Sequence, residues 1–336
     1  MMLKELSMWA EKLKEGVQLS HSFYEDYGAG LPKHIKKIAF VGMGGSGVAG
    51  RIIKTFLDRK PGITTFIVDS PIVPAGIDTQ TLAIVVSYSG QTWETLDVLD
   101  ELTQKFIPTI VIAGGGAAIQ KAELKDLPFV LLPKSIAPRA ALGHFLGFFA
   151  GLFELMGILN GASKTQQWIK QAETYVPAFV EASFFKDFLS IVNGADFFHV
   201  WGVGGDSGAC AYRAATQFNE NGKVQAVYSE FPELCHNLLA SIEYTKMTTM
   251  AVFFYSDFLP AHLDVAIQAT SEVLKENGVI LYKTPVFGDT FESQLFTMIL
   301  WADFASYHLG KARGVDIEHV KLVEELKKRH KAKGIK

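Results

Sequence analysis

The chain contains 336 residues, of which 49% are hydrophobic and 20% are charged. These values are ordinary for a globular protein and exclude a disordered chain, a collagen or a long coiled coil as the main state. With 32 Lys and Arg residues against 35 Asp and Glu residues, the net charge is −3. No nucleic-acid partner is therefore expected, because general nucleic-acid binding needs a basic excess.

The two cysteines, Cys210 and Cys235, are too few for a disulfide scaffold and too far apart for a C-x-x-C motif. We interpret both as reduced thiols of a cytoplasmic protein. The N-terminus lacks an uninterrupted apolar run and a small-residue cleavage site, so we expect no signal peptide. We expect no metal ion, because the chain has no H-x-H, H-E-x-x-H or C-x-x-C spacing.

Short apolar runs alternate with helical patterns of 10–15 residues along both halves of the chain. In the first half the runs that predict strands are 37–42, 64–69, 82–87 and 109–113. Strands that are apolar throughout and alternate with helices indicate a parallel sheet covered on both faces. Each half therefore predicts a doubly wound α/β domain, a parallel β-sheet flanked by helices.

A glycine pattern repeats between the two halves. Gly42, Gly44 and Gly45 recur as Gly202, Gly204 and Gly205. So long an offset is typical of a duplicated domain rather than of a solenoid. We expect one domain over residues 1–157 and a second over 158–336.

Residues 140–159 are almost uniformly apolar and nearly long enough to cross a bilayer. They include His144 and Glu154, and a carboxylate at mid-span is unfavourable in a membrane. We therefore predict a buried helix and no membrane association. Such a helix would also suit a buried subunit interface.

The first glycine loop matches the dinucleotide-binding pattern G-x-G-x-x-G at Gly42, Gly44 and Gly47, with Asp69 about 20 residues further on. A nicotinamide-dependent oxidoreductase is thus one interpretation. The loop's physical property is more general, because glycines let backbone N–H groups approach any anion at a helix N-terminus.

A second hydroxyl-rich turn follows the third expected strand, over residues 87–92. It supplies Ser87, Ser89 and Thr92 at the start of a helix, while the first loop supplies Ser46. Ligands of open α/β sheets bind at the carboxyl ends of the strands, so two adjacent cradles there favour one compact phosphate monoester. Helix capping by these hydroxyls is the simpler alternative. The equivalent turn of the second half carries Asp257, which would repel phosphate.

The second half also carries clustered polar residues around Glu220 and His236. One carboxylate and one imidazole can serve as base and acid without a cofactor, which suits proton transfer between adjacent carbons of a sugar. Arg139, near the start of the apolar helix, could reach a phosphate or a developing oxyanion. A solvated Glu, a structural His and a surface Arg remain the alternatives.

Five motifs in chain order carry a resemblance to a known family: VGMGGSGVAG, SYSGQTWETL, PRAALG, TQFNENGK and PELCHN. Together they resemble the bifunctional phosphoglucose/phosphomannose isomerases, which contain two sugar-isomerase (SIS) domains. The resemblance implies a cofactor-free isomerase that interconverts glucose 6-phosphate, and also mannose 6-phosphate, with fructose 6-phosphate.

The resemblance also implies roles for individual residues. Glu220 would be the base of a cis-enediol proton transfer, and Arg139 would stabilise the enediolate. His236 would assist ring opening and would reach the site from the partner subunit of a homodimer. Lys327 would lie near the ring oxygen. The sugar 6-phosphate would be held by Gly45, Ser46 and Gly47 with Ser87, Ser89 and Thr92.

The sequence departs from the family's usual pattern at several positions: Gln91, Trp93, Ala215, Cys235 and Val320. None of them removes a proposed catalytic group, but Trp93 and Val320 leave the preference between glucose and mannose phosphates open. Two further functions stay open as well. One is a non-catalytic sugar-phosphate sensor, and the other is an isomerase of an amino-sugar phosphate.

Overall fold

The computed structural model describes residues 1–134, 137–159, 164–192, 194–195, 197–242, 244 and 248–334. They form two compact units. The N-terminal unit comprises Met8–Ile169 with Val320–Lys336, and the C-terminal unit comprises Lys170–His319 with Met1–Ser7. The expected domain boundary between residues 157 and 158 stays a prediction.

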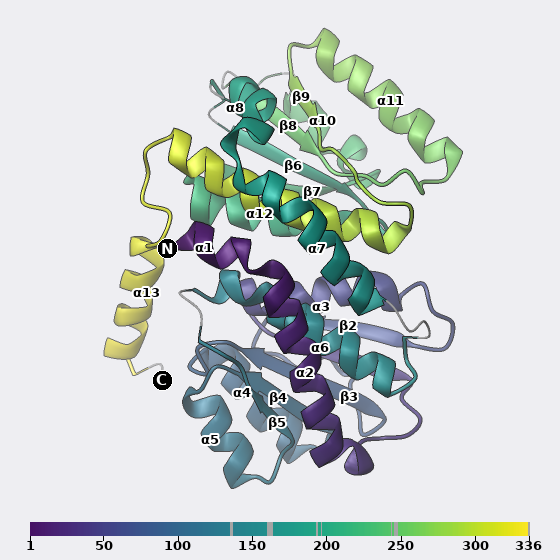
Figure 1. The fold of residues 1–336 in the computed structure, drawn as a ribbon, viewed down its shortest axis with the longest axis vertical. Coiled ribbons are helices and arrows are strands. Elements are labelled where there is room, and N and C mark those ends of the chain that lie inside the picture. Colours follow the sequence, from purple (N-terminus) through teal and green to yellow (C-terminus); the bar gives the residue numbers. More distant parts are fainter. Residues whose placement is uncertain are drawn as a thin grey trace. The chain divides into compact units, whose positions relative to one another are not determined.

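The N-terminal unit is built on a five-stranded parallel sheet with the order β2-β1-β3-β4-β5 (Figure 1). Its strands are β1 (Lys37–Val41), β2 (Thr64–Val68), β3 (Thr81–Ser87), β4 (Thr109–Ala113) and β5 (Phe129–Leu131). The four runs expected as strands in this half are confirmed. β1, β3 and β4 form strands because apolar and β-branched residues suit positions that are buried on both faces of a sheet. The edge strand β2 is only partly buried.

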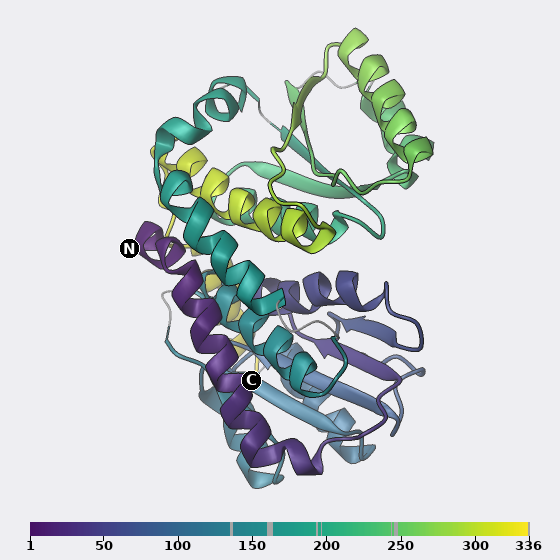
Figure 2. The same cartoon turned by 45° about the vertical axis from the view of Figure 1, so that its right-hand side comes forward.

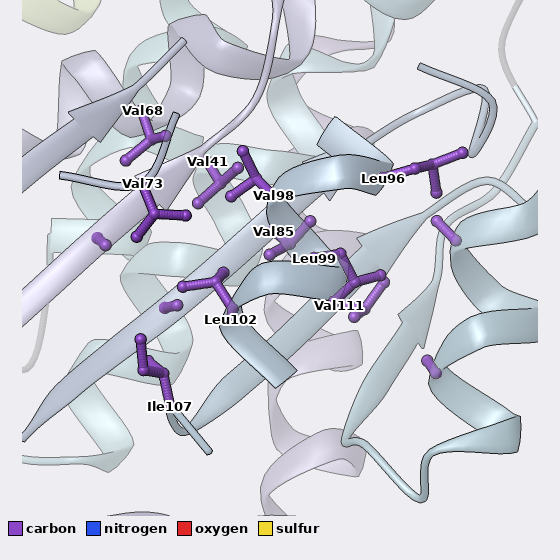
Figure 3. Close-up of a cluster of buried hydrophobic side chains, with 14 of the residues drawn as sticks. Val41, Val68, Val73, Val85, Leu96, Val98, Leu99, Leu102, Ile107 and Val111 are labelled. Carbon is purple, nitrogen blue, oxygen red and sulfur yellow. The ribbon is translucent and has the colours of Figure 1, made fainter. Parts of the chain in front are cut away.

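Helices cover both faces of this sheet. They are α2 (Trp9–Tyr27), α3 (Gly44–Leu57), α4 (Trp93–Gln104), α5 (Gly116–Leu124) and α6 (Leu142–Leu155), with the short 3-10 turns η1 (Gly28–Gly30) and η2 (Pro138–Ala141). On one face, Val41, Val85 and Val111 of successive strands pack against Leu99 and Leu102 of α4 (Figure 3). These side chains leave water together, which drives the formation of this layer.

On the other face, α6 packs between the sheet and α2. Phe40 of β1 meets Phe149 of α6 edge to face, with ring centroids 5.5 Å apart. Helices α2 and α6 run side by side, as two views show (Figures 1 and 2). The two backbones approach closely at Gly147, which has no side chain. A Cβ atom at this position would overlap the carbonyl oxygen of Leu13. At the start of α6, the buried Lys12 of α2 donates to the carbonyl of Ala140 (2.8 Å).

The prediction of a buried helix over 140–159 is therefore confirmed for Leu142–Leu155. The accompanying suggestion of a subunit interface on this helix is wrong. The side chains from Leu142 to Phe153 are all buried within their own chain, since α2 covers the face that the sheet leaves open. In the described residues, no helix is long and apolar enough to cross a membrane.

The C-terminal unit repeats the arrangement with a four-stranded parallel sheet in the order β7-β6-β8-β9. Its strands are β6 (Phe197–Val203), β7 (Gln225–Phe231), β8 (Thr249–Phe253) and β9 (Ile280–Lys283). Trp201 and Phe253 face α11 (Ala261–Glu276) on one side of the sheet. On the other side, Phe254, directly after β8, meets Trp301 of α12 (Phe291–Ala312), with ring centroids 5.8 Å apart. The prediction of two doubly wound α/β domains is confirmed.

The remaining elements complete this unit. They are α1 (Met2–Ser7), α7 (Lys164–Val180), whose first residues belong to the N-terminal unit, η3 (Ala182–Phe185), α8 (Lys186–Val192), α9 (Gly208–Gln217), η4 (Phe218–Gly222), η5 (Glu233–His236), α10 (Leu238–Ile242), α11 (Ala261–Glu276) and α12 (Phe291–Ala312). The closing helix α13 (Lys321–Ala332) is grouped with the N-terminal unit.

The close contact of α2 with α6 generates a first prediction. Gly147→Ala should lower the free energy of unfolding by about 1–3 kcal/mol, because the added methyl group overpacks a backbone contact. Gly30→Ala is the matched control, since a Cβ atom there meets nothing within 4 Å. Urea denaturation of both variants measures the difference. Equal stability of the two variants would contradict the packing described.

Candidate active site

The candidate phosphate-binding residues of the N-terminal unit lie where β1 and β3 end. In the order β2-β1-β3-β4-β5 these neighbours flank the point at which the connections reverse direction, and ligands bind at such points. The backbone N–H of Tyr88 donates a hydrogen bond to Ser46 Oγ (3.1 Å). This bond ties the loop after β1 to the turn after β3.

The turn after β3 brings its hydroxyl groups together. Ser87 Oγ donates to Thr92 Oγ1 (3.2 Å), and Ser89 Oγ accepts from the backbone N–H of Gln91 (3.2 Å). Thr92 is the N-cap residue of α4, but its side chain makes no capping hydrogen bond. Gly90 adopts a φ of 63°, and a Cβ atom there would overlap the carbonyl oxygen of Gly115, so only glycine fits this turn.

The third part of the cradle is η2, which contains Arg139. A Cβ atom on Gly45 would lie 3.2 Å from the backbone nitrogen of Arg139, so the start of α3 and η2 are in direct contact. Arg139 is 4% exposed, which excludes an ordinary surface arginine. A buried guanidinium group gives this end of the sheet a fixed positive charge.

The backbone amides contribute less than the sequence suggested. The N–H groups of Ser46 and Gly47 both donate to the carbonyl of Met43 (3.1 and 3.2 Å). The amides still available in the first turn of α3 are those of Gly44 and Gly45. With hydroxyl groups from two loops and the positive end of a helix, the arrangement can hold a compact anion.

The equivalent place in the C-terminal unit holds a carboxylate of the chain itself. Asp206 occupies the repeat position of Ser46, and Ser256 occupies that of Tyr88. The backbone N–H of Ser256 donates to Asp206 Oδ2 (3.2 Å), and Ser256 Oγ donates to the same carboxylate. Asp206 is 2% exposed. The hydrogen bond between the two loops is thus repeated with a buried anion in place of a hydroxyl group.

A second carboxylate closes the same loop. Glu230 of β7 accepts a hydrogen bond from Tyr228 Oη, and a Cβ atom on Gly208, the first residue of α9, would overlap Glu230 Oε1. A carboxylate at a helix N-terminus is electrostatically favourable. Asp206 and Glu230 therefore fill the second glycine loop, and their charges disfavour a bound phosphate. Sequence reasoning placed this repulsion at Asp257 and missed Asp206, although aligning the two loops would have revealed it.

Glu220, the expected base, lies in an unusual turn. Residues Phe218–Gly222 form one π-helical turn directly after α9, and Lys223 ends it with a φ of 50°. Turns of this kind are rare and occur frequently at functional sites. Asn219 fixes the turn to the beginning of β7, since its side-chain amide exchanges two hydrogen bonds with the backbone of Ala226 (2.8 and 3.0 Å).

His236, the expected acid, lies in η5, after the carboxyl end of β7, and it is exposed. Glu220 precedes the amino end of the same strand. A strand of seven residues spans roughly 20 Å, so one chain does not bring Glu220 and His236 together. Burial raises the pKa of the Cys235 thiol, and a contact with Thr270 Oγ1 (3.7 Å) partly offsets that rise. Cys235 is therefore a neutral neighbour of His236.

The last expected residue, Lys327, is exposed on α13, a helix without buried residues. Among the described residues of its own unit, it makes no hydrogen bond or ion pair with another candidate residue. Across all described residues of the chain, no group of three or more His, Cys, Asp or Glu side chains could hold a metal ion. Asp69, which completed the dinucleotide pattern, pairs with Arg51 of α3.

Comparisons with known proteins agree with this architecture. Residues 33–123 match the model of the SIS domain, and residues 186–329 match that of the bacterial phospho-glucose isomerase C-terminal SIS domain. In structure, the chain is similar to tagatose-6-phosphate ketose/aldose isomerase from Escherichia coli, with a TM-score of 0.71, 18% identity and 95% of each chain covered. The fold and these matches define a protein with two SIS domains.

Curated relatives identify the family more closely. The chain is 30% identical over 298 residues to the bifunctional phosphoglucose/phosphomannose isomerase of Thermoplasma volcanium, covering 87% of this chain and 90% of the relative. The enzyme of the same name from Thermoplasma acidophilum is 28% identical over 334 residues, 97% of each chain. The chain belongs to the bifunctional phosphoglucose/phosphomannose isomerase family, and it is an isomerase.

A more distant relative has a different name. D-glucosamine-6-phosphate 4-epimerase of Sulfolobus acidocaldarius is 24% identical over 323 residues, covering 91% of this chain and 94% of the relative. Relatives that match most of this chain are therefore named for more than one reaction.

The contrast between the two loops generates a second prediction. Ser46→Ala should weaken binding of inorganic phosphate by about tenfold, because a hydroxyl donor to a charged group is lost. Asp206→Asn should leave phosphate affinity unchanged, because the second loop is already filled. Isothermal titration calorimetry measures both affinities. Equal weakening by the two substitutions would contradict the assignment of phosphate to the first loop alone.

Proposed function

We propose that the protein interconverts glucose 6-phosphate and fructose 6-phosphate, with mannose 6-phosphate as a second aldose substrate. The observation that carries this proposal is the hydroxyl-lined cradle at the ends of β1 and β3, in a chain that belongs to this family of isomerases. The sugar's 6-phosphate group occupies the cradle and is held by the Gly45 amide and by the hydroxyl groups of Ser46, Ser87, Ser89 and Thr92. Gly47, whose N–H donates to the carbonyl of Met43, shapes the loop.

The proposed reaction moves one proton without a metal ion or a cofactor. The Glu220 carboxylate removes the proton from C2 of the open-chain aldose and returns it to C1, while the hydroxyl proton moves between O2 and O1 through a cis-enediol. Arg139 stabilises the negative charge that develops on the enediolate oxygens. His236 and Lys327 assist ring opening, with Lys327 near the ring oxygen.

We further propose that the active enzyme is a homodimer in which His236 acts in the partner's site. The separation of Glu220 and His236 by the length of β7 supports this, because the two side chains of one chain cannot contact one substrate. A second copy supplies the missing group without any change in the fold of either chain.

A second candidate is an isomerase of an amino-sugar phosphate. The relative named as an epimerase of D-glucosamine 6-phosphate favours it, since the same cradle and base would serve that substrate class. A sugar-phosphate sensor would bind the same ligands without turning them over. Incubation of the protein with fructose 6-phosphate and with glucosamine 6-phosphate, followed by product analysis, separates the three.

The role of Glu220 generates a third prediction. Glu220→Gln should lower kcat for fructose 6-phosphate by about a thousandfold, since a general base contributes roughly 10²–10⁴. KM should change little, because the phosphate cradle is intact. A coupled dehydrogenase assay for glucose 6-phosphate, run after EDTA treatment, measures both constants. Glu272→Gln on the exposed face of α11 is the control. A Glu220→Gln enzyme with normal turnover would refute the assignment of the base.

The shared site generates a fourth prediction. Inactive Glu220→Gln and inactive His236→Ala proteins are mixed, unfolded and refolded together. Since a mixed dimer regains one complete site, about a quarter of wild-type activity should return. No recovery, with mixed dimers present by mass spectrometry, would show that the two residues act within one chain or not at all.

A further inference from the structure

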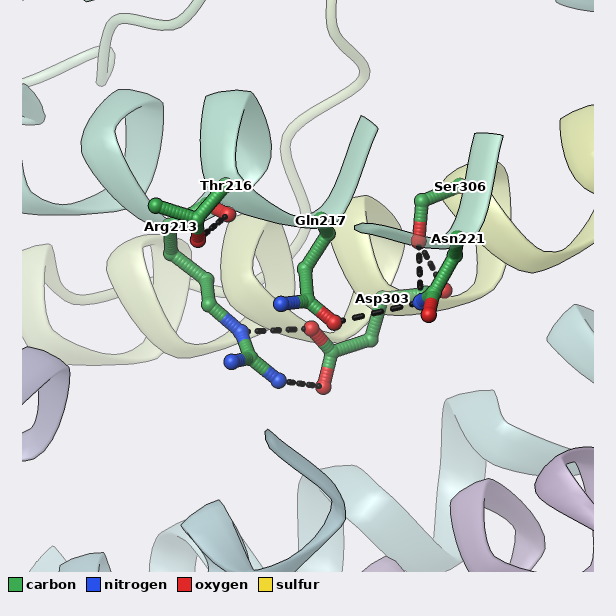
Figure 4. Close-up of polar contacts among 6 residues, drawn as sticks. All are labelled: Arg213, Thr216, Gln217, Asn221, Asp303 and Ser306. Atoms are coloured by element: carbon green, nitrogen blue, oxygen red, sulfur yellow. Dashed lines mark hydrogen bonds and ion pairs between the residues drawn. The ribbon is translucent and has the colours of Figure 1, made fainter. Parts of the chain in front are cut away.

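The π-helical turn that carries Glu220 is supported by a buried polar network, and this inference rests on the function proposed above. The network joins α9, the turn and α12 within the C-terminal unit (Figure 4). At its centre, Asn221 Nδ2 donates to Gln217 Oε1 (3.2 Å) and to Ser306 Oγ (3.0 Å). Asn221 is the residue after Glu220 and is fully buried.

On the α12 side, the network continues into a buried ion pair. Ser306 Oγ donates to the carbonyl of Asp303 (2.8 Å). The Asp303 carboxylate accepts from Arg213 Nε (2.7 Å) and from Arg213 Nη2 (3.0 Å). Both side chains of the pair are at most 1% exposed. The turn, α9 and α12 are thus linked through side chains that water does not reach.

The backbone of the turn also packs directly on α12. A Cβ atom on Gly310 would overlap the carbonyl oxygen of Asn221, and one on Gly222 would lie 2.9 Å from Leu309 Cδ2. On the other side of the turn, Lys223 Nζ donates to the carbonyls of Glu220 (2.6 Å) and His319 (2.7 Å). The backbone at Glu220 and the residues that follow it are therefore held both by α12 and by Lys223.

This network is expected to contribute little to the free energy of unfolding. Buried ion pairs lose much of their attraction to desolvation and are often replaceable by apolar residues. Gln217 Nε2 is buried and has no hydrogen-bond partner among the described residues. Such an unsatisfied group calls for an explanation other than stability. Its place beside a rare turn indicates that the network specifies a conformation.

We propose that Asn221 and Ser306 are positioning residues for Glu220. Their hydrogen bond holds the wide turn against α12 and so fixes the direction in which the Glu220 carboxylate leaves the backbone. Neither residue touches the substrate in this account. Their contribution is to keep the base aligned with the C2 and C1 protons, which a shift of about 1 Å would disturb.

The test compares two serines of α12. Ser306→Ala should lower kcat by about tenfold with KM for fructose 6-phosphate unchanged, because only the alignment of the base is relaxed. Amide hydrogen exchange at residues 218–223 should become about tenfold faster. Ser293→Ala is the matched control: Ser293 is also fully buried on α12, but it caps that helix through Thr290. It should change neither quantity.

The outcomes separate this inference from the proposed function. If the wild type isomerises and Ser306→Ala keeps a kcat and exchange rates equal to those of the Ser293→Ala control, the positioning role is refuted while the function stands. If the wild type does not isomerise, the proposed function fails, and equal exchange in the two variants would overturn the inference as well. Should Ser306→Ala fail to fold, Asn221→Ala removes the same hydrogen bond and is read in the same way.

Discussion

One hydrogen bond between two loops recurs in both halves of this molecule, and the functional account depends on it. In the N-terminal unit the Tyr88 amide donates to the Ser46 hydroxyl, and in the C-terminal unit the Ser256 amide donates to the Asp206 carboxylate. The bond connects the ends of two neighbouring central strands, where a doubly wound sheet can hold a ligand. The Ser46 hydroxyl group is small and can donate a hydrogen bond to a bound anion. The Asp206 carboxylate is itself an anion and occupies the corresponding place. The two halves have thus diverged at the side chain that accepts this hydrogen bond.

The C-terminal unit uses its polar residues elsewhere. Its carboxyl-end loop is closed by Asp206 and Glu230, while Glu220 sits before β7, on a turn that α12 supports through Asn221 and Ser306. The proposed function places binding of the phosphate group in the N-terminal unit and the base for proton transfer in the C-terminal unit.

Much of the fold, and the two turns of the candidate site, could be predicted from the sequence because they depend on short local patterns of residues. Four of the five strands of the first sheet were predictable because their apolar runs are continuous, whereas the three-residue strand β5 was not predicted. The glycine and hydroxyl motifs marked the two turns that a hydrogen bond joins at the ends of β1 and β3. The burial of Leu142–Leu155 was also predictable from its composition. The features that escaped prediction depend on contacts between distant residues. The overlap that Gly147 avoids with Leu13, the carboxylate of Glu230 at α9 and the pairing of Asn221 with Ser306 leave no signal in a short window of sequence.

The central claim is that this chain transfers a proton between C2 and C1 of a sugar 6-phosphate without a metal ion. The most direct measurement is to treat the wild-type protein with EDTA, add fructose 6-phosphate in D₂O and follow the products by NMR. The account predicts that glucose 6-phosphate forms and carries solvent deuterium at C2, because the proton held by Glu220 exchanges with water. Absence of any aldose product, or an aldose pool that still lacks deuterium at C2 after many turnovers at equilibrium, would contradict it.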